Sequence, residues 1–166
     1  MAKRQEAKLA DAVQEAAGQP LDQSLLLSLV GYNCRRAYLT ILPQFDERMK
    51  KFELRAVDFT VLSLLSANPN ITQKRLSRAV NVSPPNLAIL LDRLETRGLL
   101  MRQRNPLDKR SQTLVLTAEG AKLCAKAEKT VTELERKATD MLSDEERSQL
   151  VTLLQKIFLE GEAPQE

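Results

Sequence analysis

The segment Val82–Gly120 constrains the fold of this 166-residue chain more than any other part of it. Pro84 suits the first position of a helix, where a backbone N–H would have no partner. Gly98 suits the C-terminal cap of the same helix. Two strand patterns follow, Leu99–Arg104 and Gln112–Leu116, and the turn-rich basic sequence NPLDKRS joins them. Helix, hairpin and the start of another helix in this order predict a winged helix-turn-helix.

A shorter helix precedes this segment. Thr72 is placed to cap a helix with the sequence TQKRLSRAV, and the chain turns near Asn81. Ser83 then caps the second helix, whose inward positions are leucines at helical spacing: Leu87, Leu90, Leu91 and Leu94. Two helices joined by a few residues are the core of a helix-turn-helix.

Helical patterns continue on both sides. Residues 22–51 predict one helix, which Pro43 should bend or break, and Arg55–Ala67 predicts the next. Thr117 caps a long helix whose small and medium residues alternate at spacings of four and three, as in a heptad seam: Gly120, Cys124, Ala127, Val131, Leu134, Ala138 and Met141. Ser143 opens a last helix through a capping box, and that helix has a broad apolar face formed by Leu150, Val151, Leu154, Ile157 and Phe158.

The seam has two interpretations, because helix stripes are more often core than interface. Two long terminal helices, each apolar on a broad face, nevertheless exceed what one small winged helix can cover, and this favours a dimer. We therefore predict a mainly α fold with a small β-wing. It comprises a charged tail (1–21), a dimerisation helix (22–51), a winged helix-turn-helix that binds DNA (52–120) and C-terminal dimerisation helices (121–160).

Positive charge is concentrated in the middle of the chain. Nine Lys or Arg and three acids lie between Gln73 and Arg110, which gives this segment a charge of +6 in a chain of net +3. A basic centre in a near-neutral protein is typical of nucleic-acid binding. A solvated surface would show the same excess, so the turn and wing pattern decides between the two.

Other classes of function are disfavoured. The chain has no His and only two Cys, Cys34 and Cys124, so it lacks the residues of a His/Cys zinc site or a catalytic dyad. We predict no cofactor, no metal and no enzymatic activity, and expect both Cys to be buried small apolar residues. No apolar run approaches the ~20 residues of a membrane span, and the N-terminus lacks the apolar core of a signal peptide. The expected location is cytoplasmic.

The segment from about Leu54 to Leu123 resembles the MarR family of bacterial winged-helix regulators. The resemblance rests on DFTVLSLL, the Leu76 helix, LLDRLETRGLL, and Asp108-x-Arg110 followed by Leu116-Thr117-x-x-Gly120. It implies a homodimer with intertwined first and last helices above two winged helices. It also implies repression of transcription until a small molecule, often an aromatic acid, or an oxidant releases the DNA. The text SPPN…LLDRLE is similar to that of members linked to aromatic-acid catabolism, some of which respond to coenzyme A thioesters.

A recognition helix must present short side chains to base edges near its N-terminus. Asn86 can pair with an adenine edge, and Pro85 and Ala88 can touch a thymine methyl group. Ile89 departs from the basic or polar residue common in the family at this position. It either faces the DNA or packs in the interior of the protein. The complete predicted DNA-binding set is Thr72, Gln73, Lys74, Ser83, Pro85, Asn86, Ala88, Ile89, Arg93, Asp108, Lys109 and Arg110.

The resemblance also assigns roles in the wing. It implies that Arg110 enters the minor groove and that Asp108 orients it, with Lys109 alongside. A narrow A·T-rich groove attracts such an arginine. The alternative is a surface ion pair that touches no DNA.

Five of the six aromatic residues lie between Tyr32 and Phe59, close to two arginines. In the family plan this region joins the dimerisation and DNA-binding parts and binds effectors. An apolar cleft with arginines suits an aromatic carboxylate or a larger acyl thioester. The predicted ligand site is Tyr32, Arg35, Arg36, Tyr38 and Phe59. Ordinary core aromatics beside surface arginines are the alternative.

The leading hypothesis is a ligand-responsive regulator, a repressor that binds a palindromic duplex operator as a homodimer. A redox-sensing repressor acting through Cys34 is the alternative, because Arg35 and Tyr38 are close in sequence and thiolate stabilisation makes a cysteine reactive. The family's peroxide-sensing branch carries its Cys near the start of the first helix, whereas Cys34 lies well inside. An enzyme is the third class, and no nucleophile–base pair or phosphate loop supports it.

Overall fold

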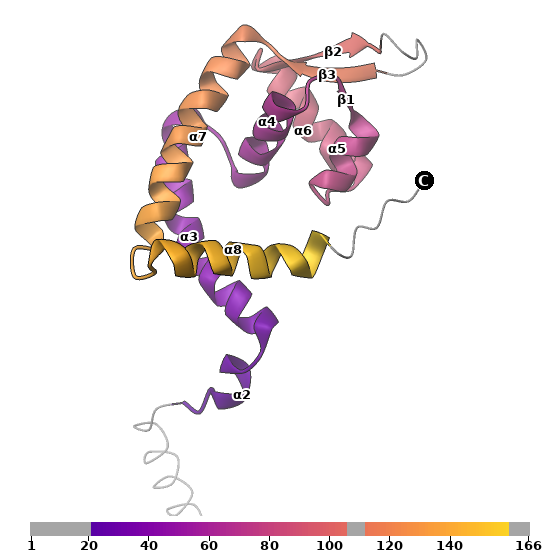
Figure 1. Cartoon of the computed structure of the whole chain (residues 1–166). Coiled ribbons are helices and arrows are strands. Elements are labelled where there is room, and N and C mark those ends of the chain that lie inside the picture. The colour runs from indigo at the N-terminus through magenta and orange to yellow at the C-terminus, as the bar shows by residue number, and fades with distance from the viewer. Residues whose placement is uncertain (1–20, 106–111, 160–166) are drawn as a thin grey trace, which may run out of the picture. The chain divides into compact units, whose positions relative to one another are not determined.

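A computed structural model describes residues 21–105 and 112–159 of the chain. The helices are α2 (Ser24–Leu27), α3 (Val30–Met49), the 3-10 helix η1 (Lys50–Phe52), α4 (Ala56–Ala67), α5 (Gln73–Ala79), α6 (Pro84–Thr96), α7 (Ala118–Ala138) and α8 (Asp144–Leu159) (Figure 1). The strands are β1 (Ile71–Thr72), β2 (Leu100–Arg104) and β3 (Gln112–Leu116). The predicted class, mainly α with a small β-wing, is confirmed. The chain forms two compact units, residues 1–39 and 40–166, which we describe separately.

In the first unit, the helix predicted over residues 22–51 is interrupted between α2 and α3. The Ser28 hydroxyl donates to the Leu25 carbonyl at 2.7 Å, a local bond that competes with continued helix. The Asn33 side-chain amide then donates to the Leu27 and Leu29 carbonyls, both at 2.8 Å. These bonds satisfy carbonyls at the end of α2. The charged tail predicted over residues 1–21 lies outside the described residues, except for Leu21.

Pro43 does not break α3, which continues through it to Met49. The helix loses one backbone bond at proline. Phe45 and Met49 follow within two turns, and both are buried in the second unit. Their packing offsets the lost bond. Pro43 therefore does not break the helix, and the other predicted outcome, a bend, stays a prediction.

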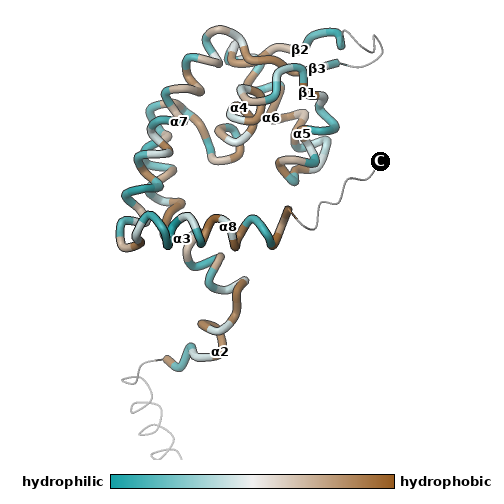
Figure 2. The backbone as a smooth tube through the Cα atoms, viewed as in Figure 1, coloured by the Kyte–Doolittle hydropathy of each residue, from teal (hydrophilic) through white to brown (hydrophobic). Residues whose placement is uncertain are grey.

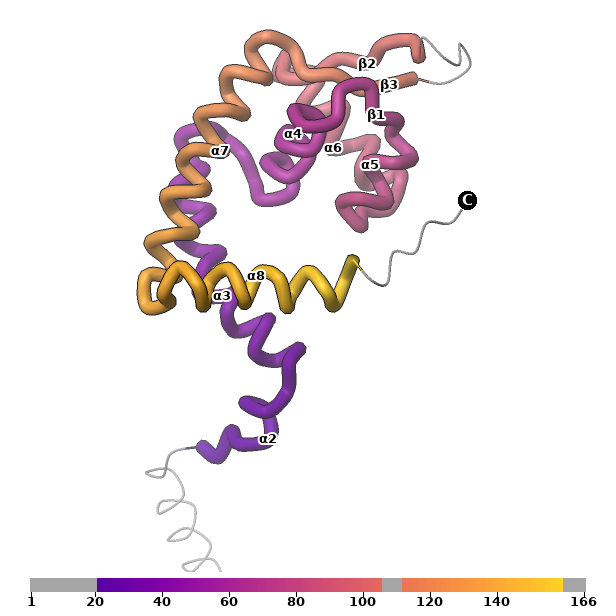
Figure 3. The backbone as a smooth tube through the Cα atoms, in the orientation of Figure 1, coloured from indigo at the N-terminus to yellow at the C-terminus, as the bar shows by residue number. Residues whose placement is uncertain are grey.

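The second unit has one apolar core, to which α4, α5, α6, α7 and the sheet all contribute. The inward leucines predicted for α6 are all buried, and they pack with Val61, Leu62, Leu65, Leu76 and Leu100. The chain path is shown in Figure 3, where α5 and α6 follow one another as the helix-turn-helix. The core therefore fixes one face of α6 and leaves its other face to solvent.

The sheet is antiparallel with strand order β1-β3-β2. The predicted hairpin is confirmed, with Leu100 opposite Leu116 and Arg104 opposite Gln112. β1 was not predicted, since two residues carry no periodicity. It pairs Ile71 with Leu114, and this pairing joins the start of the helix-turn-helix to the base of the wing.

The heptad seam belongs to the chain's own core. Gly120, Cys124, Ala127, Leu134 and Ala138 are buried, and α7 packs against α4. Spacings of four and three place these residues on one face of α7, and their small side chains let the two helices approach closely. The intramolecular interpretation is thus confirmed for α7, while Met141 lies beyond the end of the helix and is exposed.

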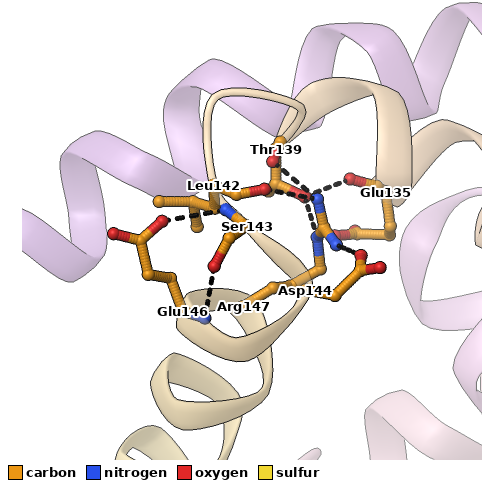
Figure 4. A network of polar contacts seen from close by, with 7 residues as sticks. All are labelled: Glu135, Thr139, Leu142, Ser143, Asp144, Glu146 and Arg147. Carbon is orange, nitrogen blue, oxygen red and sulfur yellow. Dashed lines mark hydrogen bonds and ion pairs between the residues drawn. The ribbon is translucent and has the colours of Figure 1, made fainter.

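Arg147 joins the last two helices (Figure 4). Its guanidinium donates to the Thr139 carbonyl at 2.9 Å and the Leu142 carbonyl at 3.1 Å, and it pairs with Asp144 at 2.6 Å. The predicted capping box is confirmed: the Ser143 N–H donates to Glu146 at 2.8 Å and the Glu146 N–H donates back to the Ser143 hydroxyl at 3.2 Å. The turn that directs α8 away from α7 is therefore held by several polar contacts.

The apolar face of α8 is exposed. Hydrophobic and hydrophilic turns alternate along this helix in Figure 2, and its exposed apolar residues are Leu150, Val151, Leu153, Ile157, Phe158 and Leu159. Exposed apolar surface of this extent marks an interaction site. Within the described ranges, no helix is long and apolar enough to span a bilayer.

Candidate nucleic-acid interface

The start of α6 is shaped by two consecutive prolines. Pro84 and Pro85 occupy the first two helical positions, and Ser83 lies at the N-cap as predicted. The Ser83 side chain nevertheless makes no capping bond. A capping hydroxyl accepts from the second or third helical N–H, and Pro85 has removed one of these donors. The fixed proline dihedrals define the beginning of the helix instead.

The outer face of α6 presents short and apolar side chains. Pro84, Pro85 and Asn86 are exposed, and Ala88 is half-buried. Ile89 is 70% exposed, which excludes the alternative that it packs inside. Because leucines anchor the opposite face, this surface has the position that a recognition helix needs to enter a major groove.

Positive charge lies on the preceding helix. The Thr72 hydroxyl caps α5 by accepting from the Arg75 N–H at 3.4 Å, as predicted. Lys74 is exposed, and Gln73 is half-buried. Arg75 and Arg78 are exposed on the same helix, although neither was in the predicted set. The sequence QKRLSR could have predicted both as DNA-binding residues, because its Lys and Arg residues lie together in one short helix.

Arg93, which was predicted to bind DNA, pairs with a buried carboxylate of the same chain. Its side chain is 38% exposed, and its guanidinium pairs with Asp58, whose side chain is 2% exposed. The same carboxylate accepts the Arg55 N–H at 3.0 Å, which completes the N-terminal cap of α4. The positive charge of Arg93 is therefore balanced within the protein and does not point outward like Ile89.

Two further cations of the basic segment are also engaged. Arg102 on β2 pairs with Glu95 and, at 2.6 Å, with Asp92. Arg97 donates to the carbonyl oxygens of Glu53 and Phe52, at 2.6 and 2.9 Å. These contacts reduce the charge that the segment offers to phosphates. Within residues 73–105, the described part of this segment, the exposed cations are Lys74, Arg75, Arg78 and Arg104.

The wing itself can be placed only by its strands. Asp108, Lys109 and Arg110 lie outside the described residues, so their roles stay predictions. β2 ends at Arg104, before this loop, and β3 starts at Gln112, after it.

Comparison with known proteins gives this arrangement a family. The MarR family profile matches residues 54–112. The transcriptional repressor CouR, solved bound to a 23-mer DNA duplex, is 36% identical in sequence to this chain. The match covers 84% of this chain and 99% of the CouR chain, and the two structures superpose with a TM-score of 0.77. The chain belongs to the MarR family. It is accordingly a transcriptional regulator that binds DNA, and the family is one of regulators and not of enzymes.

Two other relatives extend the comparison. CouR bound to p-coumaroyl-CoA is 34% identical with a TM-score of 0.72, covering 83% of this chain and 97% of its own. A putative transcriptional regulatory protein for the hcr operon of Thauera aromatica is 27% identical over 130 residues, which is 78% of each protein. The predicted kinship with the branch of the family linked to aromatic-acid catabolism fits these matches.

The predicted effector residues are distributed over both units. Tyr32, Arg35, Arg36 and Tyr38 lie in the first unit, and Phe59 lies in the second. The Tyr32 hydroxyl donates to the Gln23 side chain at 2.9 Å. Phe59 packs edge-to-face on Phe45, with ring centroids 5.8 Å apart. Their joint role in binding a ligand therefore stays a prediction.

The two cysteines differ in environment. Cys124 is buried, as expected, but Cys34 is exposed, so the expectation of burial is wrong for Cys34. Burial of the Cys124 thiol, and then the charge of Glu128, raise its pKa to about 11. Thiolate is the reactive form, so Cys124 is a poor nucleophile at neutral pH.

This contrast predicts the labelling of the native protein. At pH 8 only about one Cys124 in a thousand is thiolate, because its pKa is raised by burial. We expect iodoacetamide to modify one thiol per chain quickly, at Cys34, and to reach Cys124 only after unfolding. Mass spectrometry of proteolytic peptides measures both sites, and Cys34→Ser is the control that should lose the fast reaction. Rapid native labelling of Cys124 would contradict this environment.

Proposed function

We propose that this regulator is a repressor that binds a palindromic operator as a homodimer and is released by an aromatic acyl-CoA thioester or the free aromatic acid. The observation that carries the proposal is the outer face of α6, where Asn86 and Ile89 are exposed on a helix fixed from behind by leucines. Exposed cations on α5 supply the accompanying phosphate contacts. The proposed DNA-binding set omits Arg93, which pairs with Asp58. It consists of Thr72, Gln73, Lys74, Ser83, Pro85, Asn86, Ala88 and Ile89, with Asp108, Lys109 and Arg110 in the wing.

The homodimer is supported by the exposed apolar face of α8. Its side chains include Leu153, Ile157 and Phe158, which are 51%, 64% and 56% exposed. A second copy of the same face is the partner that a two-fold interface supplies. Two-fold symmetry in the protein matches a palindrome in the DNA. In this proposal residues 22–51 and 121–160 dimerise and 52–120 bind DNA, in the cytoplasm.

The effector is supported by chemistry and by kinship. Arg35 and Tyr38 are exposed in the first unit, where a guanidinium and a phenol suit an anionic aromatic ligand. CouR, a repressor, binds p-coumaroyl-CoA. We therefore place the effector near Tyr32, Arg35, Arg36, Tyr38 and Phe59.

Calorimetry with p-coumaroyl-CoA tests the proposal. An operator is first selected from a pool of random duplexes, and light scattering gives the mass of the free protein. A ligand can release DNA only through different affinities for the two states. A coupling of ~1–3 kcal/mol weakens the complex ~5–150-fold, and operator must weaken ligand binding by the same factor.

Controls separate the parts of this proposal. p-Coumarate is the matched ligand without the coenzyme, and coenzyme A is the matched ligand without the aromatic group. Equal affinity with and without operator for all three rules out release by this chemistry. Loss of DNA binding after peroxide treatment, abolished in Cys34→Ser, would instead support the redox alternative.

A further inference from the structure

Arg93 on α6 and Arg97 at the C-terminal cap of that helix, one helical turn apart, contact the same short segment of the chain. Arg97 donates to the carbonyl oxygens of Phe52 and Glu53 at 2.9 and 2.6 Å. Glu53 is left-handed with φ 54° and ends η1. A non-glycine residue in this region of backbone space is held there by its surroundings. Arg97 supplies part of that restraint.

The second arginine reaches the start of α4. Arg93 pairs with Asp58, and Asp58 also caps α4 through the Arg55 N–H. The Arg93 Nε is buried without a hydrogen-bond partner among the described residues. A partly buried guanidinium needs an opposite charge, so Arg93 depends on Asp58. Residues 52–58 are thus attached to α6 at two points.

The opposite side of α6 is attached to the wing. Asp92 and Glu95 both pair with Arg102 on β2. Acidic groups of α6 therefore hold the wing strand, while basic groups of the same helix hold residues 52–58. Four buried leucines already anchor α6 in the core. The ion pairs are additional restraints, and they bear on the rotation and tilt of the helix.

We propose that Arg93 and Arg97 are positioning residues for DNA reading. They fix the outer face of α6 relative to residues 52–58, the segment that runs from the end of η1 into the first turn of α4. A displacement of that segment changes the aim of Asn86 and Ile89 and with it the affinity for operator. This inference rests on the proposed function and adds the residues that orient the reading helix.

The test compares operator with a scrambled duplex of the same length. Loss of a positive charge weakens binding to both duplexes about equally, whereas loss of orientation weakens operator alone. Arg97→Gln is expected to lower the ratio of operator to scrambled affinity roughly tenfold. Arg136→Gln removes the same charge from an exposed position on α7 and is expected to leave the ratio unchanged.

Arg93 requires a paired variant, because a single substitution would leave the Asp58 carboxylate buried and unpaired. Asp58→Asn combined with Arg93→Gln removes both charges; Asn keeps the shape of Asp, and Gln keeps a polar side chain at position 93, although it is shorter than Arg. We expect this variant to lower the ratio as Arg97→Gln does, while circular dichroism and thermal melting show a folded protein.

The outcomes are distinguishable. A wild-type preference for operator that all three variants retain overturns the positioning role and leaves the proposed function intact. A wild-type protein without any sequence preference overturns both. An equal loss of ratio in Arg136→Gln also overturns the inference, because charge alone would then explain the effect.

Discussion

Operator affinity is expected to fall by ~10³–10⁵ when the salt concentration rises from about 50 to about 200 mM. Each phosphate neutralised by a Lys or Arg releases condensed counterions, and added salt opposes that release. A dimer that contacts roughly six to ten phosphates gives a fall of this size. Lys74, Arg75 and Arg78 are exposed on α5, and two copies would supply most of these contacts.

Fluorescence anisotropy with labelled operator over a salt series measures this dependence. Scrambled duplex serves as the control, since the phosphate term is independent of sequence and should show a similar slope. Arg78→Gln should reduce the slope by about one for each phosphate contact it loses. A slope near zero would mean that the exposed cations of α5 do not face DNA.

Gly120→Ala is expected to destabilise the fold by about 3 kcal/mol or more. A Cβ atom at this position would lie 1.8 Å from the Leu99 carbonyl oxygen and 2.7 Å from its carbonyl carbon. Both are backbone atoms, so a rotamer change cannot relieve the overlap. Gly120 lies in the first turn of α7, and its N–H donates to the Thr117 hydroxyl at 2.9 Å. Relief of the overlap therefore requires the helix to move away from Leu99.

Thermal unfolding at fixed protein concentration measures the change, which corresponds to a Tm lower by roughly 6–12 °C for a chain of this size. Gly31→Ala is the matched control. Gly31 lies in α3, where an added Cβ meets nothing within 4 Å, and alanine favours a helix over glycine by about 1 kcal/mol. An unchanged Tm in Gly120→Ala would show that α7 does not approach Leu99 so closely.

Features with a local physical cause could be predicted from the sequence. Gly98 has a φ of 69°, as a C-terminal cap requires. The Thr117 hydroxyl caps α7, and Ser143 with Glu146 forms the capping box of α8. Each depends on residues within four positions of one another, so a short stretch of sequence is enough to predict the cap or the turn.

Features that depend on distant residues could not be predicted. The pairing of Arg93 with Asp58 joins positions 35 apart, and no periodic pattern in the sequence predicts an ion pair between them. β1 exists because β3 offers Ile71 a partner. The spacing of the α7 seam showed that something packs against it, but spacing does not specify whether the partner is the same chain. The structure shows that the partner is α4 of the same chain.

The paired prolines at the start of α6 have a thermodynamic consequence. A helix N-terminus ordinarily binds phosphate through its first backbone N–H groups, and Pro84 and Pro85 have none. Here the end of the reading helix offers hydrocarbon, with Ile89 beside it. In the proposed complex, contact of this helix end with base edges removes water from apolar surface, and we expect a negative change in heat capacity on association. If α6 reads the operator as proposed, binding should become more exothermic as temperature rises, because apolar surface is buried between protein and DNA.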